Sequence, residues 1–183
     1  LNKKFLRYIE DPKERKIVIY FFQQFDEFVK PKLEKLRTSI IHNDTNEWNV
    51  LIKKNKELGI IDFGDLTESQ LVNEVAISMT YASYDKEKPL SSASLVLKSY
   101  NKIMRLTDTE VSLIYYLMAA KLCISVCNSA YSKKINPKNK YALISEKSAW
   151  RMLKYLIKIS PIHAENIFRK ALNRKITRVK SIK

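Results

Sequence analysis

A short segment, residues 42–63, interrupts a sequence whose apolar residues otherwise recur at helical spacing. Two β-type runs, Asn49–Ile52 and Leu58–Asp62, flank the polar turn Lys53–Glu57. This arrangement is typical of a two-stranded antiparallel hairpin. We expect this hairpin to be the only β-structure, and the fold class to be mainly α with one small β-hairpin.

The hairpin brings together residues that lie far apart in the chain. Pairing centred on the turn predicts that Val50 lies opposite Ile61 and, one step further, that Asn49 lies opposite Asp62. Directly opposed residues have Cβ atoms about 5 Å apart. The sequence therefore predicts that these two polar side chains converge, with Asp44 on the loop that leads into the hairpin.

Helix signals surround this segment. A helix should start at Asp11-Pro12, because Pro is well placed in a first helical turn, and should end or kink at Pro31. After the hairpin we expect helices to resume from Leu66. A capping box, Thr107 to Glu110, predicts a long apolar helix from about Asp108 to Ser132. Two further helices are expected near Ser145–Ile159 and Pro161–Ile176.

The long apolar helix and the cysteines limit the class of protein. Lys121 and other polar residues interrupt the helix, so we expect a buried core helix and no membrane span. Two cysteines in 183 residues exclude a disulfide scaffold and fit a reducing, cytoplasmic location. Cys123 and Cys127 have no other metal-binding residue near them, so we expect small buried residues there and no zinc site.

Charge is distributed unevenly. Lys and Arg number 34 against 19 Asp and Glu, for a net charge of +15 at pH 7. No acidic residue follows Glu165, so residues 165–183 form a basic C-terminal helix or tail. A basic surplus raises nucleic acid or an acidic protein as a partner, but this tail lacks interleaved aromatic residues and any reader motif. We therefore do not expect nucleic acid to be the main partner.

Oxygen-bearing side chains gather around the hairpin in a chemically specific pattern. His42-x-Asp44 is followed five residues later by Asn49, and residues 62–64 are a literal Asp-Phe-Gly. In phosphoryl transfer, a catalytic-loop Asp accepts the proton of the substrate hydroxyl, and an Asn and the D-F-G Asp hold Mg²⁺. The next helix signal follows Asp65 at once, which leaves no room for a peptide-binding activation segment.

These residues resemble a known family. The segments His42-x-Asp44-x-Asn46-x-x-Asn49-Val50-Leu51 and Gly59–Asp65 look like the aminoglycoside phosphotransferase and choline kinase superfamily. With the run Asn73–Ile77, they are most similar to the hydroxylysine kinase-like branch. The resemblance is sharp over residues 37–81. It implies the C-terminal lobe of a protein-kinase-like fold.

The resemblance also implies residue roles. The general base falls on Asp44 and the Mg²⁺ ligands fall on Asn49 and Asp62. His42 would support the catalytic loop, and Glu74 stands where many members carry an Asp that orders this loop.

Further residues near these positions have less specific expected roles. Asn46 and Asp65 are candidates for substrate or metal assistance, although Asp65 could equally cap the following helix. Asn43 replaces the commoner Gly, and Asn is the next most tolerant residue at positive φ. Trp48 could stack on a substrate, but we expect a core aromatic residue.

The nucleotide-binding half of such a kinase has no counterpart in the sequence. Residues 1–41 offer no strand-rich segment and no glycine-rich loop, and the whole chain holds only Gly59 and Gly64. We expect residues 1–183 to be the catalytic and substrate lobe, with the N-terminal lobe in the same or a longer polypeptide.

The expected function is a small-molecule kinase. It would transfer the γ-phosphoryl group of ATP or GTP, with Mg²⁺, to a hydroxyl of an amine-bearing metabolite such as hydroxylysine, an amino-alcohol or an aminoglycoside. Two alternatives stay open at this point. One is a non-catalytic basic helical module that binds nucleic acid or an acidic partner, and the other is an inactive lobe that has lost its function.

Overall fold

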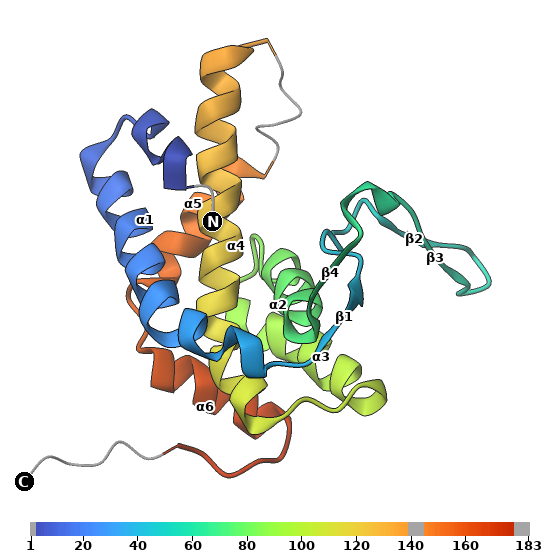
Figure 1. Ribbon diagram of the computed structural model, residues 1–183. Coiled ribbons are helices and arrows are strands. Elements are labelled where there is room, and N and C mark those ends of the chain that lie inside the picture. The colour runs from blue at the N-terminus through green and yellow to red at the C-terminus, as the bar shows by residue number, and fades with distance from the viewer. Residues whose placement is uncertain (1–2, 139–144, 178–183) are drawn as a thin grey trace, which may run out of the picture.

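The computed structural model describes residues 3–138 and 145–177, and in them the fold is mainly helical, as predicted (Figure 1). The strands form two separate antiparallel pairs, β1 with β4 and β2 with β3. The α-helices are α1 (Pro12–Gln24), α2 (Leu71–Ala82), α3 (Pro89–Ile103), α4 (Asp108–Ile135), α5 (Glu146–Leu156) and α6 (Pro161–Ala171). The strands are β1 (Thr38–Ile41), β2 (Val50–Ile52), β3 (Leu58–Ile60) and β4 (Thr67–Gln70).

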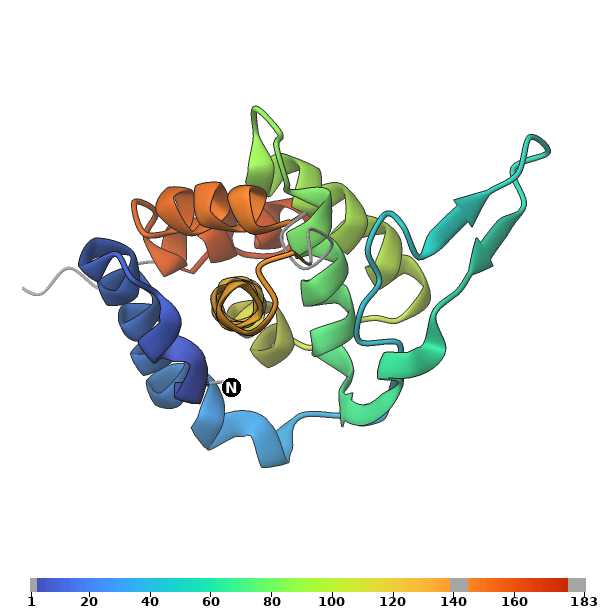
Figure 2. The ribbon, with the colours of Figure 1, turned by 90° about the horizontal axis from the view of Figure 1, so that it is seen from above.

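Helix α4 runs through the middle of the molecule and packs against α1, α2, α5 and α6 (Figure 2). The predicted capping box closes its first turn: the Glu110 backbone N–H donates to the Thr107 hydroxyl, and the Thr107 N–H donates to the Glu110 carboxylate. Among the described residues α4 alone is long and apolar enough to cross a membrane, but 72% of its apolar window is buried inside the protein. It is a core helix, as expected.

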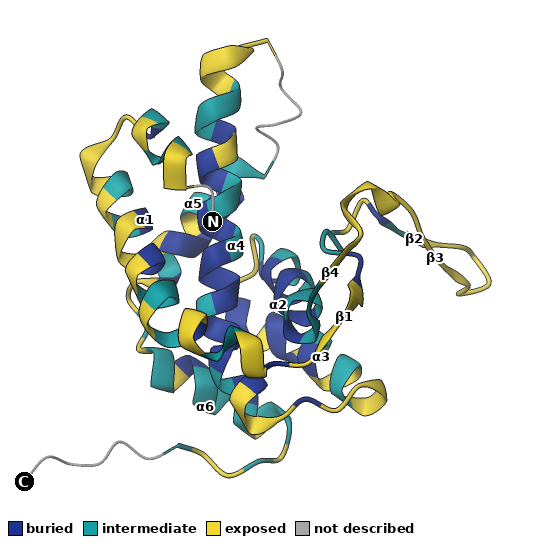
Figure 3. Ribbon diagram, viewed as in Figure 1, coloured by how far each residue is buried: buried dark blue, intermediate teal, exposed yellow. Residues whose placement is uncertain are grey.

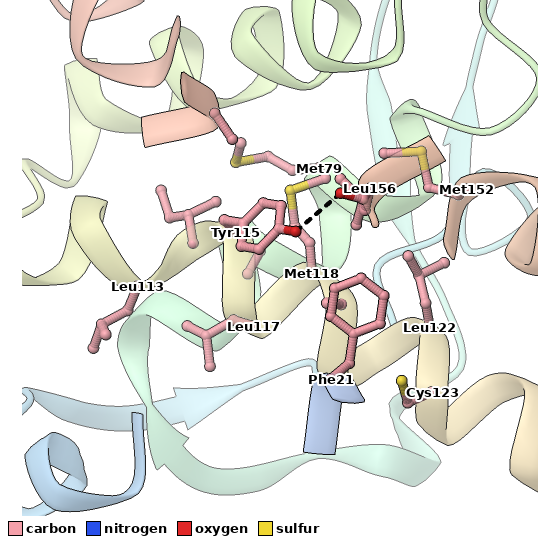
Figure 4. Close-up of a cluster of buried hydrophobic side chains, with 14 of the residues drawn as sticks. Phe21, Met79, Leu113, Tyr115, Leu117, Met118, Leu122, Cys123, Met152 and Leu156 are labelled. Carbon is pink, nitrogen blue, oxygen red and sulfur yellow. Dashed lines mark hydrogen bonds between the residues drawn. The ribbon is translucent and has the colours of Figure 1, made fainter. Parts of the chain in front are cut away.

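The core forms around α4 (Figure 4). The hydroxyl of buried Tyr115 donates to the backbone oxygen of Leu156 at 3.0 Å, which satisfies its polar group and ties α5 to α4. Cys123 and Cys127 are buried free thiols, as predicted, and burial raises the pKa of Cys127 to about 11. Both behave as small apolar residues of the core.

The first helix begins and ends where the sequence indicates. Asp11 caps α1 by accepting a hydrogen bond from the Lys13 N–H at 2.7 Å, and Pro12 occupies the first turn. Regular α-helix stops at Gln24. A π turn (Phe25–Val29) and a 3₁₀ segment (Lys30–Lys35) follow, the latter with Pro31 in its first turn. Pro31 thus lies where the π turn changes to the 3₁₀ segment, but the regular α-helix ends earlier than predicted, at Gln24.

The prediction of one hairpin as the only β-structure was wrong. Strand β1 pairs with β4, with Ile41 opposite Thr67. No turn signal marks this pair, because the whole hairpin separates its two strands and because Leu36 and Ile40 continue the helical spacing. Helix α2 accordingly starts at Leu71, later than the expected return of helix at Leu66.

The β2–β3 hairpin exists, but its register differs from the prediction by one residue. Val50 lies opposite Ile60 and not opposite Ile61. The Ile61 backbone N–H donates to the Asn49 backbone oxygen at 3.0 Å, so Ile61 is the residue across from Asn49. Asp62 is the next residue along the chain. The difference comes from the turn. Lys56 takes a positive φ of 66°, which lets the Lys53 N–H pair with the Glu57 carbonyl across three loop residues.

The hairpin projects from the helical body, and most of its residues are exposed (Figure 3). Apolar side chains are among them: Ile52 is 72% and Leu58 71% exposed. In the described residues, few contacts hold this segment beyond its own ladder. It is therefore an apolar extension of the body with little packing of its own.

The basic C-terminal segment exposes less of its arginine side chains than its composition suggests. The last helix ends at Ala171, before the expected Ile176, and Asn173 turns the chain with a φ of 55°. Arg169 and Arg174 both bind Asp108 at the start of α4, and their side chains are only 14% and 15% exposed. Residues 178–183 lie outside the described residues, and with them Arg178, Lys180 and Lys183 of the predicted tail.

Candidate active site

Two loops meet at the end of the helical body, and each is anchored at both ends by strands. Residues 42–49 connect β1 to β2, and residues 61–66 connect β3 to β4. Because β1 pairs with β4 and β2 pairs with β3, both loops lie between the same two strand pairs. His42 bridges them: its Nε2 lies 2.9 Å from the backbone oxygen of Ile61. The pairing that sequence analysis missed is thus what aligns the two loops.

Asp44 lies half-buried at the centre of the first loop. Its Oδ1 accepts hydrogen bonds from the Tyr81 hydroxyl at 2.7 Å and from the Lys121 ammonium at 3.1 Å. Burial raises the pKa of Asp44, but these two donors and Asn46 outweigh it, so the pKa lies below its ordinary value. The carboxylate is therefore ionised at neutral pH and can accept a proton.

Asn46 and Asn49 organise the loop around this carboxylate. The Asn46 Nδ2 donates to Asp44 Oδ2 at 2.9 Å, and its Oδ1 accepts from the backbone N–H groups of Trp48 and Asn49. The Asn49 Nδ2 donates to the Asp44 carbonyl at 2.9 Å. The side-chain amide of Asn46 is thus used within the loop, whereas the side-chain oxygen of Asn49, Oδ1, is left for a ligand.

Asp62 begins the Asp-Phe-Gly turn with a left-handed backbone, φ 63°. Its side chain is exposed, and no hydrogen bond joins its carboxylate to any residue of the described ranges. A Cβ on Gly64 would come within 3.4 Å of Asp62 Oδ1. Glycine therefore leaves the space beside the carboxylate that any larger residue would fill.

The donor set fits Mg²⁺ better than a transition metal. Asn49 and Asp62 supply hard oxygen atoms, and Mg²⁺ is commonly held by one or two such protein ligands together with phosphate oxygens and water. Residues 3–138 and 145–177 contain no group of three or more His, Cys, Asp or Glu that could hold a metal alone. These two residues could hold Mg²⁺ only jointly with a phosphate-bearing ligand.

Glu74 on α2 anchors the start of the loop. One of its carboxylate oxygens accepts from the Asn43 backbone N–H at 3.1 Å, and the other accepts from the Thr45 hydroxyl. Asn43 has a φ of 67°, the left-handed conformation for which Asn is a tolerated substitute for Gly. The loop is therefore bent at Asn43 and held by a carboxylate from the helical body.

One of the two roles left open for Asp65, and the expectation for Trp48, were wrong. Asp65 does not cap the next helix, because strand β4 follows it and the cap position of α2 is Gln70. Asp65 is exposed at the end of the Asp-Phe-Gly turn. Trp48 is not a core aromatic residue: 69% of it is exposed. Both residues lie in the strand and loop segment, where little of the chain is buried.

Tyr81 and Lys121, the two donors to Asp44 Oδ1, were not predicted from the sequence. Tyr81 follows Glu74 by seven residues, two helical turns, so it shares a face of α2 with the loop anchor. Lys121 is a single charged residue within the apolar middle of α4. That isolated charge was visible in the sequence, but its partner lies 77 residues away.

Comparison with known proteins identifies the family of this chain. The sequence profile described as the phosphotransferase enzyme family matches residues 1–99. A protein named hydroxylysine kinase from Mus musculus is 29% identical over 178 residues, which cover 92% of this chain and 47% of the relative. The hydroxylysine kinase of Xenopus laevis is 28% identical over 167 residues, 85% of this chain and 45% of the relative.

The chain thus spans about half the length of the curated relatives it matches. The matched profile covers both loops of the site and Tyr81, whereas Lys121 lies beyond it. The resemblance inferred from the sequence motifs is confirmed. This chain belongs to the phosphotransferase enzyme family, and within it the chain is similar to the hydroxylysine kinases.

Proposed function

We propose that this chain is the catalytic lobe of a small-molecule kinase. The kinase would transfer the γ-phosphoryl group of ATP or GTP to a hydroxyl of an amine-bearing acceptor such as hydroxylysine, an amino-alcohol or an aminoglycoside. The observation that carries the proposal is the ionised carboxylate of Asp44, held between Tyr81, Lys121 and Asn46 beside the Asp-Phe-Gly turn. Catalysis of this kind needs positioning and electrostatic stabilisation more than covalent chemistry.

In the proposed reaction the acceptor oxygen attacks the γ-phosphorus, and the bond from that phosphorus to the bridging oxygen of the nucleotide breaks. The hydroxyl proton passes to the carboxylate of Asp44. Asn49 and Asp62 would hold Mg²⁺, which supplies neutralisation of the phosphate charge when bound. His42 and Glu74 would keep the two loops in register.

The acceptor proposal rests on charge and on the relatives. Glu47 and Asp65 add carboxylates to the loops that carry Asp44 and Asp62, so the loop surface suits a cationic acceptor together with a metal–nucleotide. Glu47, Asp62 and Asp65 are all exposed, and Asp65, which closes the Asp-Phe-Gly turn, is our candidate for contact with the acceptor amine or with the metal. Asn46 would act through Asp44. Hydroxylysine is the first acceptor to test, because the relatives bear its name.

We further propose that a nucleotide-binding lobe of the same or a longer polypeptide covers the β2–β3 hairpin. Large exposed apolar side chains on a projecting hairpin mark an interaction surface. Ile52, Leu58 and Ile60 are 72%, 71% and 49% exposed. In this proposal residues 1–183 form the C-terminal lobe, and the hairpin is the part that reaches the nucleotide.

The alternative of a basic nucleic-acid-binding module has less support. Arg169 and Arg174 bind Asp108, and Arg174 also donates to the Leu106 carbonyl at 2.6 Å. These contacts use the two arginines to fasten the C-terminal segment to α4. Contacts with nucleic-acid phosphates instead need Lys and Arg side chains that are not already paired with carboxylates of the protein.

The test is a phosphoryl-transfer assay on the longest native polypeptide that contains this chain. ATP and GTP are crossed with hydroxylysine, ethanolamine, choline and an aminoglycoside. We expect nucleotide- and acceptor-dependent turnover that Asp44→Asn lowers by about 10²- to 10⁴-fold, the usual share of a general base. Absence of turnover with every acceptor would contradict the proposal. DNA retention with a steep salt dependence that Asp44→Asn leaves unchanged would favour the basic module.

A further inference from the structure

Two hydrogen-bond donors contact the same oxygen of the Asp44 carboxylate, so its two oxygens have different surroundings. We infer that Tyr81 and Lys121 are positioning residues that fix Oδ1 of Asp44 and so leave Oδ2 to accept the acceptor hydroxyl. The inference rests on the proposed function and adds to it the choice of reacting oxygen and two residues from the helical body. Lys121 lies outside the residues that the family profile matches.

Tyr81 supplies a neutral donor from the last turn of α2. Its hydroxyl lies 2.7 Å from Asp44 Oδ1, and its ring contacts the ring of Tyr84 edge-on at a centroid distance of 5.5 Å. Burial and the bond to Asp44 raise the pKa of Tyr81 far above its ordinary value. The phenol therefore stays protonated at neutral pH and donates to Oδ1.

Lys121 supplies a cationic donor from the middle of α4. Its ammonium lies 3.1 Å from Asp44 Oδ1 and 5.4 Å from the centre of the Tyr81 ring. Its side chain is only 19% exposed, and it projects from the helix around which the core is built. Three elements, the loop and two helices, thus meet at one carboxylate oxygen, which restricts its rotation.

The count of acceptor positions distinguishes the two oxygens. A carboxylate oxygen offers about two lone-pair positions, and on Oδ1 both are used by Tyr81 and Lys121. On Oδ2, Asn46 donates at 2.9 Å, while Asn49 lies at 3.5 Å, the limit of a hydrogen bond. Oδ2 therefore retains an acceptor position for a hydroxyl, on the oxygen nearest the proposed metal ligand Asn49.

The test uses variants that keep volume and remove one donor: Tyr81→Phe and Lys121→Met, in the longest native polypeptide. We expect each to lower kcat about 10- to 100-fold, because a misplaced reacting group loses roughly this much. The KM for the nucleotide should stay within about twofold, since neither residue belongs to the proposed metal site. The double variant should lose less than the product of the two single losses, because both donors act on one oxygen.

Two matched controls lie close to the two donors along the chain: Tyr84 follows the end of α2, and Lys133 belongs to α4. Tyr84→Phe removes a neighbouring hydroxyl that makes no hydrogen bond to Asp44 in the described structure. Lys133→Met removes a lysine of α4 that pairs with Glu146 instead. Both should keep kcat within about twofold of the wild type. The inference is overturned if Tyr81→Phe and Lys121→Met behave like their controls while Asp44→Asn is inactive.

A second measurement separates this inference from the proposed function. The melting temperatures of Asp44→Asn, Lys121→Met and the double variant form a cycle that needs no turnover. We expect the two changes to be non-additive, because each removes the partner of the other. Additive effects in an active kinase would overturn the inference alone. Non-additive effects in a protein without phosphoryl transfer would overturn the proposed function, and with it the role of the pair.

Discussion

The helical body and the strand segment that carries the site are built in different ways. The body gains its stability from side chains buried around α4, including Phe21, Met118 and Phe168. The strand segment, residues 38–70, buries few side chains and depends on ladder hydrogen bonds, on the positive φ values of Asn43 and Asp62, and on polar contacts with the body. The helical body therefore holds the exposed segment that carries the site in one geometry.

A few polar contacts join the two regions. Glu74, Tyr81 and Lys121 reach from helices to the loop that carries Asp44. Just before β1, the Arg37 guanidinium donates two hydrogen bonds to the carboxylate of Glu110, a member of the α4 capping box. Substitutions in the body, at these contacts and in the hairpin should therefore have different effects on stability and activity.

Removing a core side chain should unfold the body. Phe21 is 1% exposed and contacts Tyr115. Phe21→Ala should lower the free energy of unfolding by about 3–5 kcal/mol, because the lost transfer energy adds to that of the cavity. Chemical denaturation followed by circular dichroism measures this change. A loss below about 1 kcal/mol would show that the core is not where the stability lies.

Removing the loop anchor should separate activity from stability. Glu74→Ala removes the acceptor of two loop hydrogen bonds, so the Asp44 loop loses its position while the core stays intact. We expect kcat to fall about 10²-fold, with a change in the free energy of unfolding of only about 1 kcal/mol. Equal losses for Glu74→Ala and Phe21→Ala in a denaturation experiment would contradict the division into two regions.

The Arg37–Glu110 contact should make stability depend on pH. Burial raises the pKa of Glu110, but Arg37 and Thr107 outweigh it and the pKa lies below its ordinary value of 4.5. A lowered pKa contributes stability that is present above pH 4.5 and lost as the pH falls through the folded-state value. Arg37→Met should therefore cost about 1–2 kcal/mol at pH 7 and less in acid. A cost that does not change with pH would contradict this assignment.

The smallest effect is expected on the hairpin. Leu58→Ser should change the stability of the 183-residue chain by less than about 0.5 kcal/mol, because Leu58 is 71% exposed. In the longest native polypeptide the same change should cost more, since a second lobe would bury this side chain. Thermal melting of both proteins, each with and without the substitution, makes the comparison. Equal small effects in both would contradict the proposed lobe contact.

Local patterns in the sequence predicted much of this molecule, and long-range pairing accounts for the rest. The helix caps at Asp11 and Thr107, the hairpin and the motif residues are set by neighbours within a few positions. The register was missed because it depends on the left-handed backbone of one turn residue, Lys56. The β1–β4 pair was missed because no residue near Thr38–Ile41 in the sequence indicates that this segment pairs with β4.

The same reasoning applies to the site. Asp44, Asn49 and Asp62 could be predicted as site residues because their spacing is fixed along the chain, whereas Tyr81 and Lys121 reach Asp44 from 37 and 77 residues away. A lone Lys in an apolar helix and a Tyr two turns from Glu74 were visible signals. Neither signal identifies Asp44 as the partner, because that contact depends on how the helices pack.

The most direct test of the central claim is to follow the phosphorus itself. The longest native polypeptide, as wild type and as Asp44→Asn, is incubated with Mg²⁺, nucleotide and hydroxylysine, and the products are followed by ³¹P NMR. We predict a new phosphate-ester signal with the wild type, which is absent or formed at least about 10²-fold more slowly with Asp44→Asn. An ester that forms equally fast with both proteins, or release of inorganic phosphate alone, would contradict the assignment of Asp44 as the base of a kinase.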